Sequence, residues 1–219
     1  HKAGAKVTYT DYRSGNNPLI LASQNGHTDI VRDLIKAGAN VNYANKEGNN
    51  ALIVASHNGH TEIVKDLLKA GAEVTRTGRY DPDALFFASQ NGHTDIVTLL
   101  VNGGAKVNDN LSSNALLVAS EKGYTDIVRD LLKAGGEVTR TDWHRNNPLI
   151  LASKNGHTDI VTFLINAGAN VNDANEDGNN ALILAAQNGH TDIVRDLLNG
   201  GAKVDTANKK GNTALIVAS

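Results

Sequence analysis

The side chains that could carry chemistry are mainly histidines, and most of them recur at one fixed spacing. Five of the eight histidines stand in repeated Gly-His-Thr segments, at His27, His60, His93, His157 and His190. A zinc site would need several imidazoles about 2.0–2.1 Å from one ion, whereas packed helices lie roughly 8–10 Å apart. Neighbouring repeats therefore cannot share an ion through this column, and we predict structural histidines that bond locally at helix starts.

Other catalytic patterns are not apparent in the sequence. Asp29 and its equivalents follow a threonine at each predicted helix start, where the positive end of the helix dipole explains an acid. The chain has no cysteine, no serine in a nucleophile elbow and no phosphate-binding glycine loop. We predict no catalytic residue, no metal and no cofactor.

Composition excludes further classes of function. The net charge of −2 provides no field to attract nucleic acid or an anionic membrane. No apolar run approaches the roughly 18 residues of a membrane helix, and no secretory signal is visible. The sequence therefore predicts a cytoplasmic protein, or a recombinant product with no natural location, that binds neither nucleic acid nor membrane.

The elements that position these residues recur with the same period. Gly26, Gly59, Gly92, Gly123, Gly156 and Gly189 are separated by 33, 33, 31, 33 and 33 residues. In the second unit, residues 51–56 predict a short helix that ends at a left-handed Gly59. Thr61 is expected to cap the next helix with its hydroxyl. Ile63, Val64, Leu67 and Leu68 then form one apolar stripe.

The segment from Gly48 to Val74, GNNALIVASHNGHTEIVKDLLKAGAEV, resembles the ankyrin-repeat motif. The resemblance implies an all-α solenoid of stacked helix-turn-helix units with projecting β-hairpin or loop tips. The family's T-P-L-H start is replaced by sequences such as Asn17-Pro18-Leu19-Ile20. Because asparagine is a good N-cap and proline fits the first helical position, the helix starts are expected to survive.

We expect a single array over residues 1–219. Six full units span 16–48, 49–81, 82–112, 113–145, 146–178 and 179–211, between partial units at 1–15 and 212–219. Leu215, Ile216 and Val217 would be left exposed, so we expect further residues, a cap or another molecule to cover them. Residues 16–42 and 146–172 differ at only four positions, which indicates either recent duplication or an engineered array.

The tips vary more than the helices. They span residues 11–14, 43–47, 76–81, 109–112, 140–145, 173–177 and 206–210, numbered here one to seven. Tips three and five lose the turn glycine, to Asp81 and Arg145, and tip five carries the only tryptophan, Trp143. Tip four is two residues short and is expected to leave a notch between its neighbours. Tips two, six and seven are typical of solvated turns.

The resemblance implies binding of a folded protein through the tips and the concave surface of the first helices. Trp, Tyr and Arg are enriched at binding hot spots. The predicted partner is another protein with an apolar cleft and an acidic rim. The predicted contact residues are Trp143, Tyr80, Arg79, Arg145, His144, Arg76, Arg140, Leu111, Tyr12, Tyr43, His57, Gln90 and Glu121.

Two alternatives to protein binding stay open at this point. Arginines of tips three to five could instead form a receptor for an anionic small ligand or an oligonucleotide. A purely structural spacer would predict equivalent tips, against what the sequence shows. Phe86 and Phe87 replace aliphatic residues, and we favour their filling space beside the short tip over direct partner contact.

Overall fold

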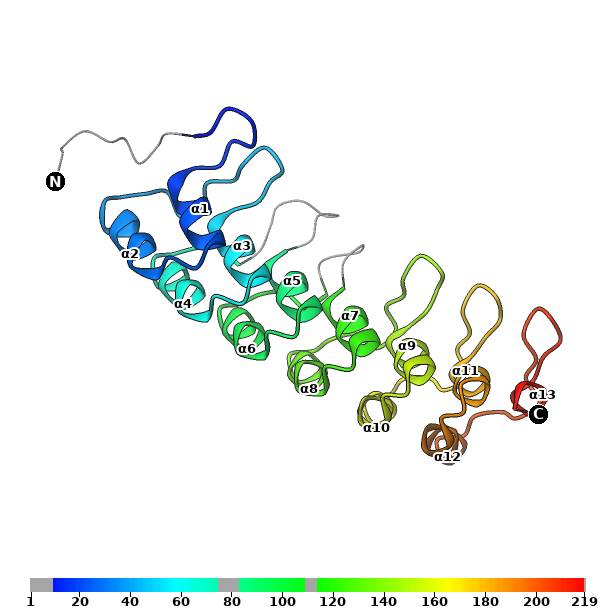
Figure 1. Cartoon of the computed structure of the whole chain (residues 1–219). Helices are drawn as coiled ribbons and strands as arrows, with labels where there is room; N and C mark the ends of the chain where they lie inside the picture. Colours follow the sequence, from blue (N-terminus) through cyan, green and yellow to red (C-terminus); the bar gives the residue numbers. More distant parts are fainter. Residues whose placement is uncertain (1–9, 75–82, 109–113, 219) are drawn as a thin grey trace. The chain divides into compact units, whose positions relative to one another are not determined.

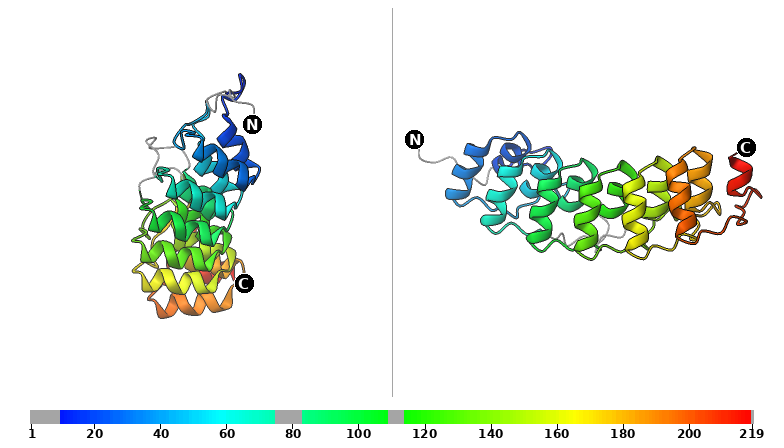
Figure 2. Two further views of the ribbon diagram at one scale, coloured as in Figure 1. Left: turned by 90° about the vertical axis from the view of Figure 1, so that its left-hand side faces the viewer. Right: turned by 90° about the horizontal axis from the view of Figure 1, so that it is seen from below.

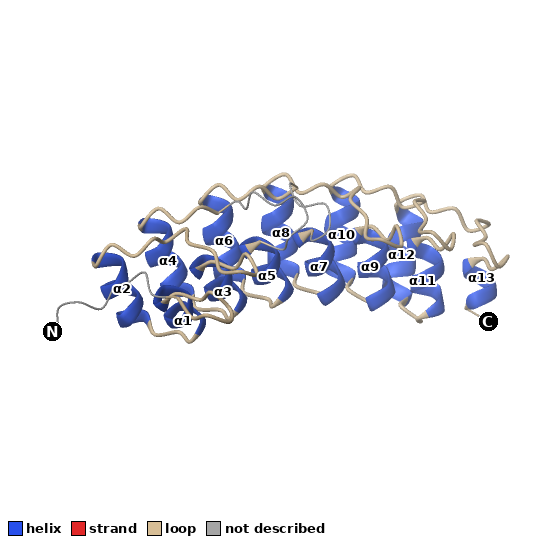
Figure 3. Cartoon of the chain, turned by 90° about the horizontal axis from the view of Figure 1, so that it is seen from above, coloured by secondary structure: helices blue, strands red, loops and turns tan. Residues whose placement is uncertain are grey.

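The structure is a computed structural model that describes residues 10–74, 83–108 and 114–218. The chain forms two compact units, residues 1–109 and 110–219. Each unit is built from helix pairs joined by loops, as Figures 1 and 3 show. Within the described residues no strand is assigned, and the β-structure found there is an isolated bridge between Ala174 and Asn180. The all-α prediction is confirmed.

The first unit contains three helix pairs. Each pair consists of a seven-residue helix followed by a nine-residue helix, and these are called the inner and the outer helix of the pair. Inner helices pack on inner helices and outer helices on outer helices, which gives the two rows visible in Figure 2. The helices are α1 (Pro18–Gln24), α2 (Thr28–Lys36), α3 (Ala51–His57), α4 (Thr61–Lys69), α5 (Ala84–Gln90) and α6 (Thr94–Asn102).

The second unit repeats this arrangement and adds one short inner helix. Its inner row is α7, α9, α11 and α13, and its outer row is α8, α10 and α12. The helices are α7 (Ala115–Lys122), α8 (Thr125–Lys133), α9 (Pro148–Asn155), α10 (Thr158–Asn166), α11 (Ala181–Gln187), α12 (Thr191–Asn199) and α13 (Ala214–Val217).

Asparagine starts most inner helices, as predicted. The side-chain oxygen of Asn17 accepts a hydrogen bond from the Ile20 N–H at 2.8 Å, and Asn50 does the same for Ile53 at 2.9 Å. Pro18 occupies the first turn, where its missing N–H costs nothing. The loss of the family's T-P-L-H sequence is thus compensated by a local cap.

The outer helices begin differently from the prediction. Thr61 is the first helical residue, and the cap position falls on His60, which makes no side-chain cap bond. The Thr61 N–H donates to the Gly59 oxygen at 3.0 Å, and the His60 carbonyl accepts from Val64. The expected threonine cap is therefore wrong, because the Gly-His turn positions the chain through its backbone.

The apolar stripes form the core of both units. Ile63, Val64 and Leu67 are fully buried, as are Ile127 and Leu131 of the second unit. Such fully buried aliphatic side chains each contribute about 1.5–3 kcal/mol to folding. The rows of helices therefore hold the loops in fixed positions along each unit.

Candidate functional site

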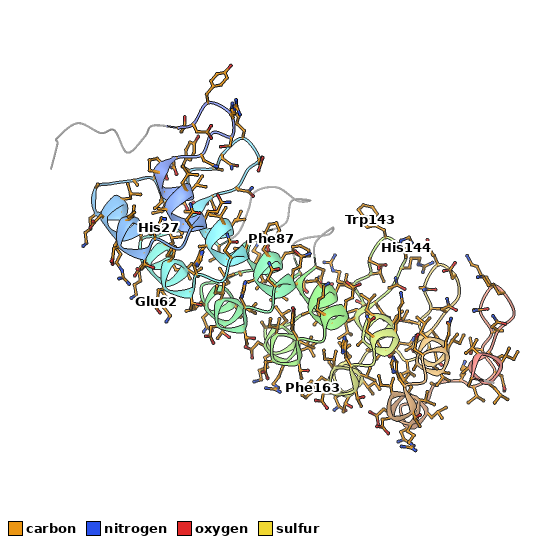
Figure 4. The ribbon with its side chains drawn as sticks, in the orientation of Figure 1. His27, Glu62, Phe87, Trp143, His144 and Phe163 are labelled. Atoms are coloured by element: carbon orange, nitrogen blue, oxygen red, sulfur yellow. The ribbon has the colours of Figure 1, made fainter. Side chains whose placement is uncertain are left out.

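Tip five presents the tryptophan to solvent. Trp143 is 83% exposed, and its side chain points away from the helices in Figure 4. Asp142 fixes this turn, because its carboxylate accepts from the N–H groups of His144 at 2.9 Å and of Asn146 at 2.8 Å. Because these hydrogen bonds already order the loop, binding a partner through the indole would lose little conformational entropy.

Arg145 ends tip five in a backbone conformation that normally selects glycine. Its φ is 62°, the only positive value for a non-glycine residue in the described part of the chain. The equivalent Gly48, Gly178 and Gly211 have φ between 77° and 79°. An L-residue in this region costs roughly 1–2 kcal/mol, so arginine is retained here against the preference of the fold.

Replacing Arg145 with glycine is expected to stabilise the chain by about 1 kcal/mol, because glycine adopts this φ without strain. Chemical denaturation at equilibrium measures the change. The reverse substitution at a matching turn, Gly211→Arg, serves as the control and should destabilise by a similar amount, because a Cβ atom at Gly211 would meet nothing within 4 Å. A loss of stability in Arg145→Gly would show that the arginine contributes to folding.

His144 joins tip five to tip six. Its Nδ1 lies in contact with the Glu176 carboxylate, and its carbonyl oxygen accepts from the Glu176 N–H at 2.9 Å. The hydrogen bond and charge of Glu176 raise the pKa of His144 above its ordinary value of 6.5; Asp142 and Asp177 act in the same direction, and burial opposes them. Tip six is therefore not the independent solvated turn that its sequence suggests.

The contact between His144 and Glu176 is expected to depend on pH. Because the pKa of folded His144 is raised, the contribution to stability is fully present below about pH 6.5 and is lost as pH rises through the folded value. An NMR titration of the imidazole protons should place the midpoint above 6.5, and Glu176→Gln should lower it. An unchanged midpoint in that variant would contradict the assignment.

The predicted arginine cluster receives little support from the described residues. Arg140 forms an ion pair with Glu137, with Nε 2.8 Å from the carboxylate. This pairing neutralises a charge that an anionic ligand would need. Tyr80, Arg79, Arg76 and Leu111 lie outside the described residues, as does tip four with its expected notch.

The two tyrosines of the first unit have different surroundings. Tyr12 is 92% exposed on tip one, where the Lys46 ammonium lies 5.2 Å from the ring centroid and donates to the Tyr12 carbonyl. Tyr43 is half-buried, and its hydroxyl donates to the Gly15 carbonyl at 2.9 Å. Tyr12 is thus available to a partner, whereas Tyr43 links tip two to tip one.

The predicted inner-helix contacts lie at the ends of three inner helices. His57 and Glu121 are exposed, and Gln90 is half-buried. His57 packs edge-on against Phe87 with ring centroids 5.1 Å apart, and Phe87 packs likewise against Phe86 at 5.7 Å. The half-buried phenylalanines thus form an aromatic cluster with His57.

The histidine column bonds between repeats rather than locally, which corrects the prediction. The Nε2 atom of His60 lies 3.1 Å from the Gln24 carbonyl of the preceding repeat, and His93 meets the His57 carbonyl at the same distance. His157 and His190 repeat this bond in the second unit. Within the described residues no group of three potential metal ligands occurs.

The last helix leaves an apolar surface. Leu215 is 80% exposed and Ile216 is 55% exposed. Leu215 borders a hollow of about 610 Å³ that is lined by residues of α11, α12 and α13, and also by Val204. The exposure expected for Leu215 and Ile216 is present, whereas Val217 is half-buried. The covering group remains a prediction. Among the described helices none is long and apolar enough to cross a bilayer.

Some contacts of the site had no signal in the sequence. The His144–Glu176 contact joins residues 32 positions apart. The contact of Lys46 with Tyr12 likewise joins separate tips. A 33-residue period places neighbouring tips side by side, which could have suggested such pairs, but not which side chains meet.

Comparisons with known proteins agree with this architecture. A family model described as "Ankyrin repeats (3 copies)" matches residues 2–78, 76–142 and 149–219. Among solved structures, the human ASB11 ankyrin repeat domain is similar, with a TM-score of 0.83 and 26% identity. The similarity covers 93% of this chain and 92% of that one. No curated protein matches the sequence.

Proposed function

Because this chain belongs to the ankyrin-repeat family, whose repeats generally mediate protein–protein interaction, we propose that it is a non-catalytic scaffold that binds a folded protein partner. The binding surface consists of tips five and six and exposed positions along the inner helices α7 and α9. The observation that carries the proposal is Trp143, a large apolar side chain held in solvent by a hydrogen-bonded turn.

The chemistry of Trp143 defines the partner's central feature. The indole offers a large apolar area and one N–H donor that needs an acceptor when buried. An apolar cleft with a carbonyl or carboxylate at its base satisfies both requirements. Arg145 would then meet an acidic group at the rim, which sets orientation and association rate more than affinity.

One tip alone is too small to form a standard protein–protein interface. A standard interface uses about 20–30 residues and buries about 800 Å² on each partner. Glu121 and Lys154 extend the surface from tip five along the inner helices α7 and α9, and both are exposed. In the first unit, Tyr12 and His57 are also exposed.

Affinity capture with the whole chain as bait tests the proposal. The recovered partner should quench or blue-shift the fluorescence of Trp143, the only tryptophan of the chain, because binding removes the indole from water. Capture that is unchanged by Trp143→Ala, with a fluorescence spectrum unaffected by the partner, would place the site elsewhere. An anion receptor is disfavoured by the Arg140–Glu137 pair.

A further inference from the structure

Charged side chains alternate in sign along the last three tips. Tip five ends in Arg145, tip six carries Asp177 beside Glu176, and tip seven carries Lys209 and Lys210. Arg145, Asp177 and both lysines are exposed. The order of charge is therefore positive, negative and positive in three consecutive tips of the second unit.

These charges are not neutralised within the tips. On the outer helices, Arg129 pairs with Asp126 and Arg195 pairs with Asp192, each three residues apart. In the part of the chain that the structure describes, the side chains of Arg145, Asp177, Lys209 and Lys210 enter no ion pair. Glu176 is engaged by His144, and Arg140 at the start of tip five is paired with Glu137.

Backbone contacts hold the three tips in register. The Glu176 N–H donates to the His144 carbonyl at 2.9 Å, and the Lys209 N–H donates to the Asp177 carbonyl at 3.0 Å. The side chain of Asn208 also donates to that of Asn179 at 2.7 Å. The spacing of the charges is thus fixed by the repeat rather than by flexible loops.

The repeat spacing corresponds to a simple pattern in a partner. Packed helices lie roughly 8–10 Å apart, and a segment in the extended polyproline II conformation advances about 3.1 Å per residue, with every third side chain on the same face. One step between tips therefore matches about three residues of an extended segment. Complementary charges would stand at every third position of such a segment.

We propose that tips five to seven bind an extended partner segment with the pattern acid-x-x-base-x-x-acid. This inference rests on the proposed function and names the segment that lies beside Trp143. The first acid meets Arg145, the base meets Asp177, and the second acid meets the lysines of tip seven. Alternating charge selects the partner's register, because a segment shifted by three residues places like charges opposite each other.

Two synthetic peptides test the charge order by NMR with the whole ¹⁵N-labelled chain at low salt. The first has the sequence EAPKAPE and the second KAPEAPK, so both favour the polyproline II conformation and the sign of each charge is reversed between them. Because the chain carries a net charge of −2, its overall field favours the second peptide. We expect the first to bind about fivefold tighter, as three exposed charge pairs allow, with shifts in tips five to seven.

Reversal of the tip charges supplies the decisive comparison. The exchange variant Arg145→Asp with Asp177→Arg keeps the net charge at −2 and should prefer the second peptide. A control variant, Asp126→Arg with Arg129→Asp, exchanges a paired set on α8 and should keep the original preference. Equal binding of both peptides, or a preference that the exchange variant retains, would overturn the inference. The effect of Trp143→Ala on the captured partner tests the proposed function separately.

Discussion

Replacing Trp143 with alanine is expected to weaken binding of the captured partner by at least about 2 kcal/mol, roughly 30-fold in Kd. The side chain is 83% exposed and contacts no core, so the substitution should leave the fold intact. In a complex, the same side chain would lose its whole hydration shell. Isothermal titration calorimetry measures the affinity, and far-ultraviolet circular dichroism confirms the helix content.

The control for this experiment must be chosen from the structure. Glu176 lies on a tip with the sequence of an ordinary turn, but it contacts His144. Its substitution would disturb tip five, so it is unsuitable as a control. Ile30→Ala is better matched, because Ile30 is an exposed apolar residue of the outer helix α2, 52% accessible to solvent. We expect Ile30→Ala to change the affinity by less than about 0.5 kcal/mol. Equal losses in the two variants would contradict a site at tip five.

Features encoded within a few residues could be predicted from the sequence. Asn17 and Asn50 cap helices through bonds to N–H groups three residues ahead, so the local motif contains the whole interaction. The left-handed glycine at position 59 and the buried stripe of Ile63 and Leu67 are local in the same sense. The 33-residue period then determines how these pieces stack.

Contacts between repeats could not be predicted in the same way. The bond from His60 to the Gln24 carbonyl joins residues 36 positions apart, and nothing near His60 identifies its acceptor. The assumption of a local bond was wrong because the ring reaches across to the preceding repeat. At tip five the sequence identified Trp143 and the lost glycine, but the restraint of His144 by Glu176 depends on the stacking of two tips.

The stacking of histidine on glycine leads to the largest expected effect on stability. Gly59 has φ +78°, and a Cβ atom there would lie 2.7 Å from Cε1 of the His93 ring. That ring cannot move freely, because its Nε2 is bonded to the His57 carbonyl at 3.1 Å. Gly59→Ala therefore combines backbone strain with displacement of an inter-repeat hydrogen bond. We expect a loss of about 2–3 kcal/mol in the free energy of unfolding.

Gly71→Ala separates these two causes. Gly71 has φ +86°, and a Cβ atom there would meet nothing within 4 Å. Gly71→Ala should therefore lower the free energy of unfolding only by the cost of backbone strain, about 1 kcal/mol. Equilibrium urea denaturation of both variants measures the two changes. Removing the ring with His93→Ala should make Gly59→Ala as mild as Gly71→Ala, because the two sites are coupled through direct contact. If Gly59→Ala and Gly71→Ala cost the same in the presence of His93, the ring yields without loss, and the glycine is required only for its backbone angle.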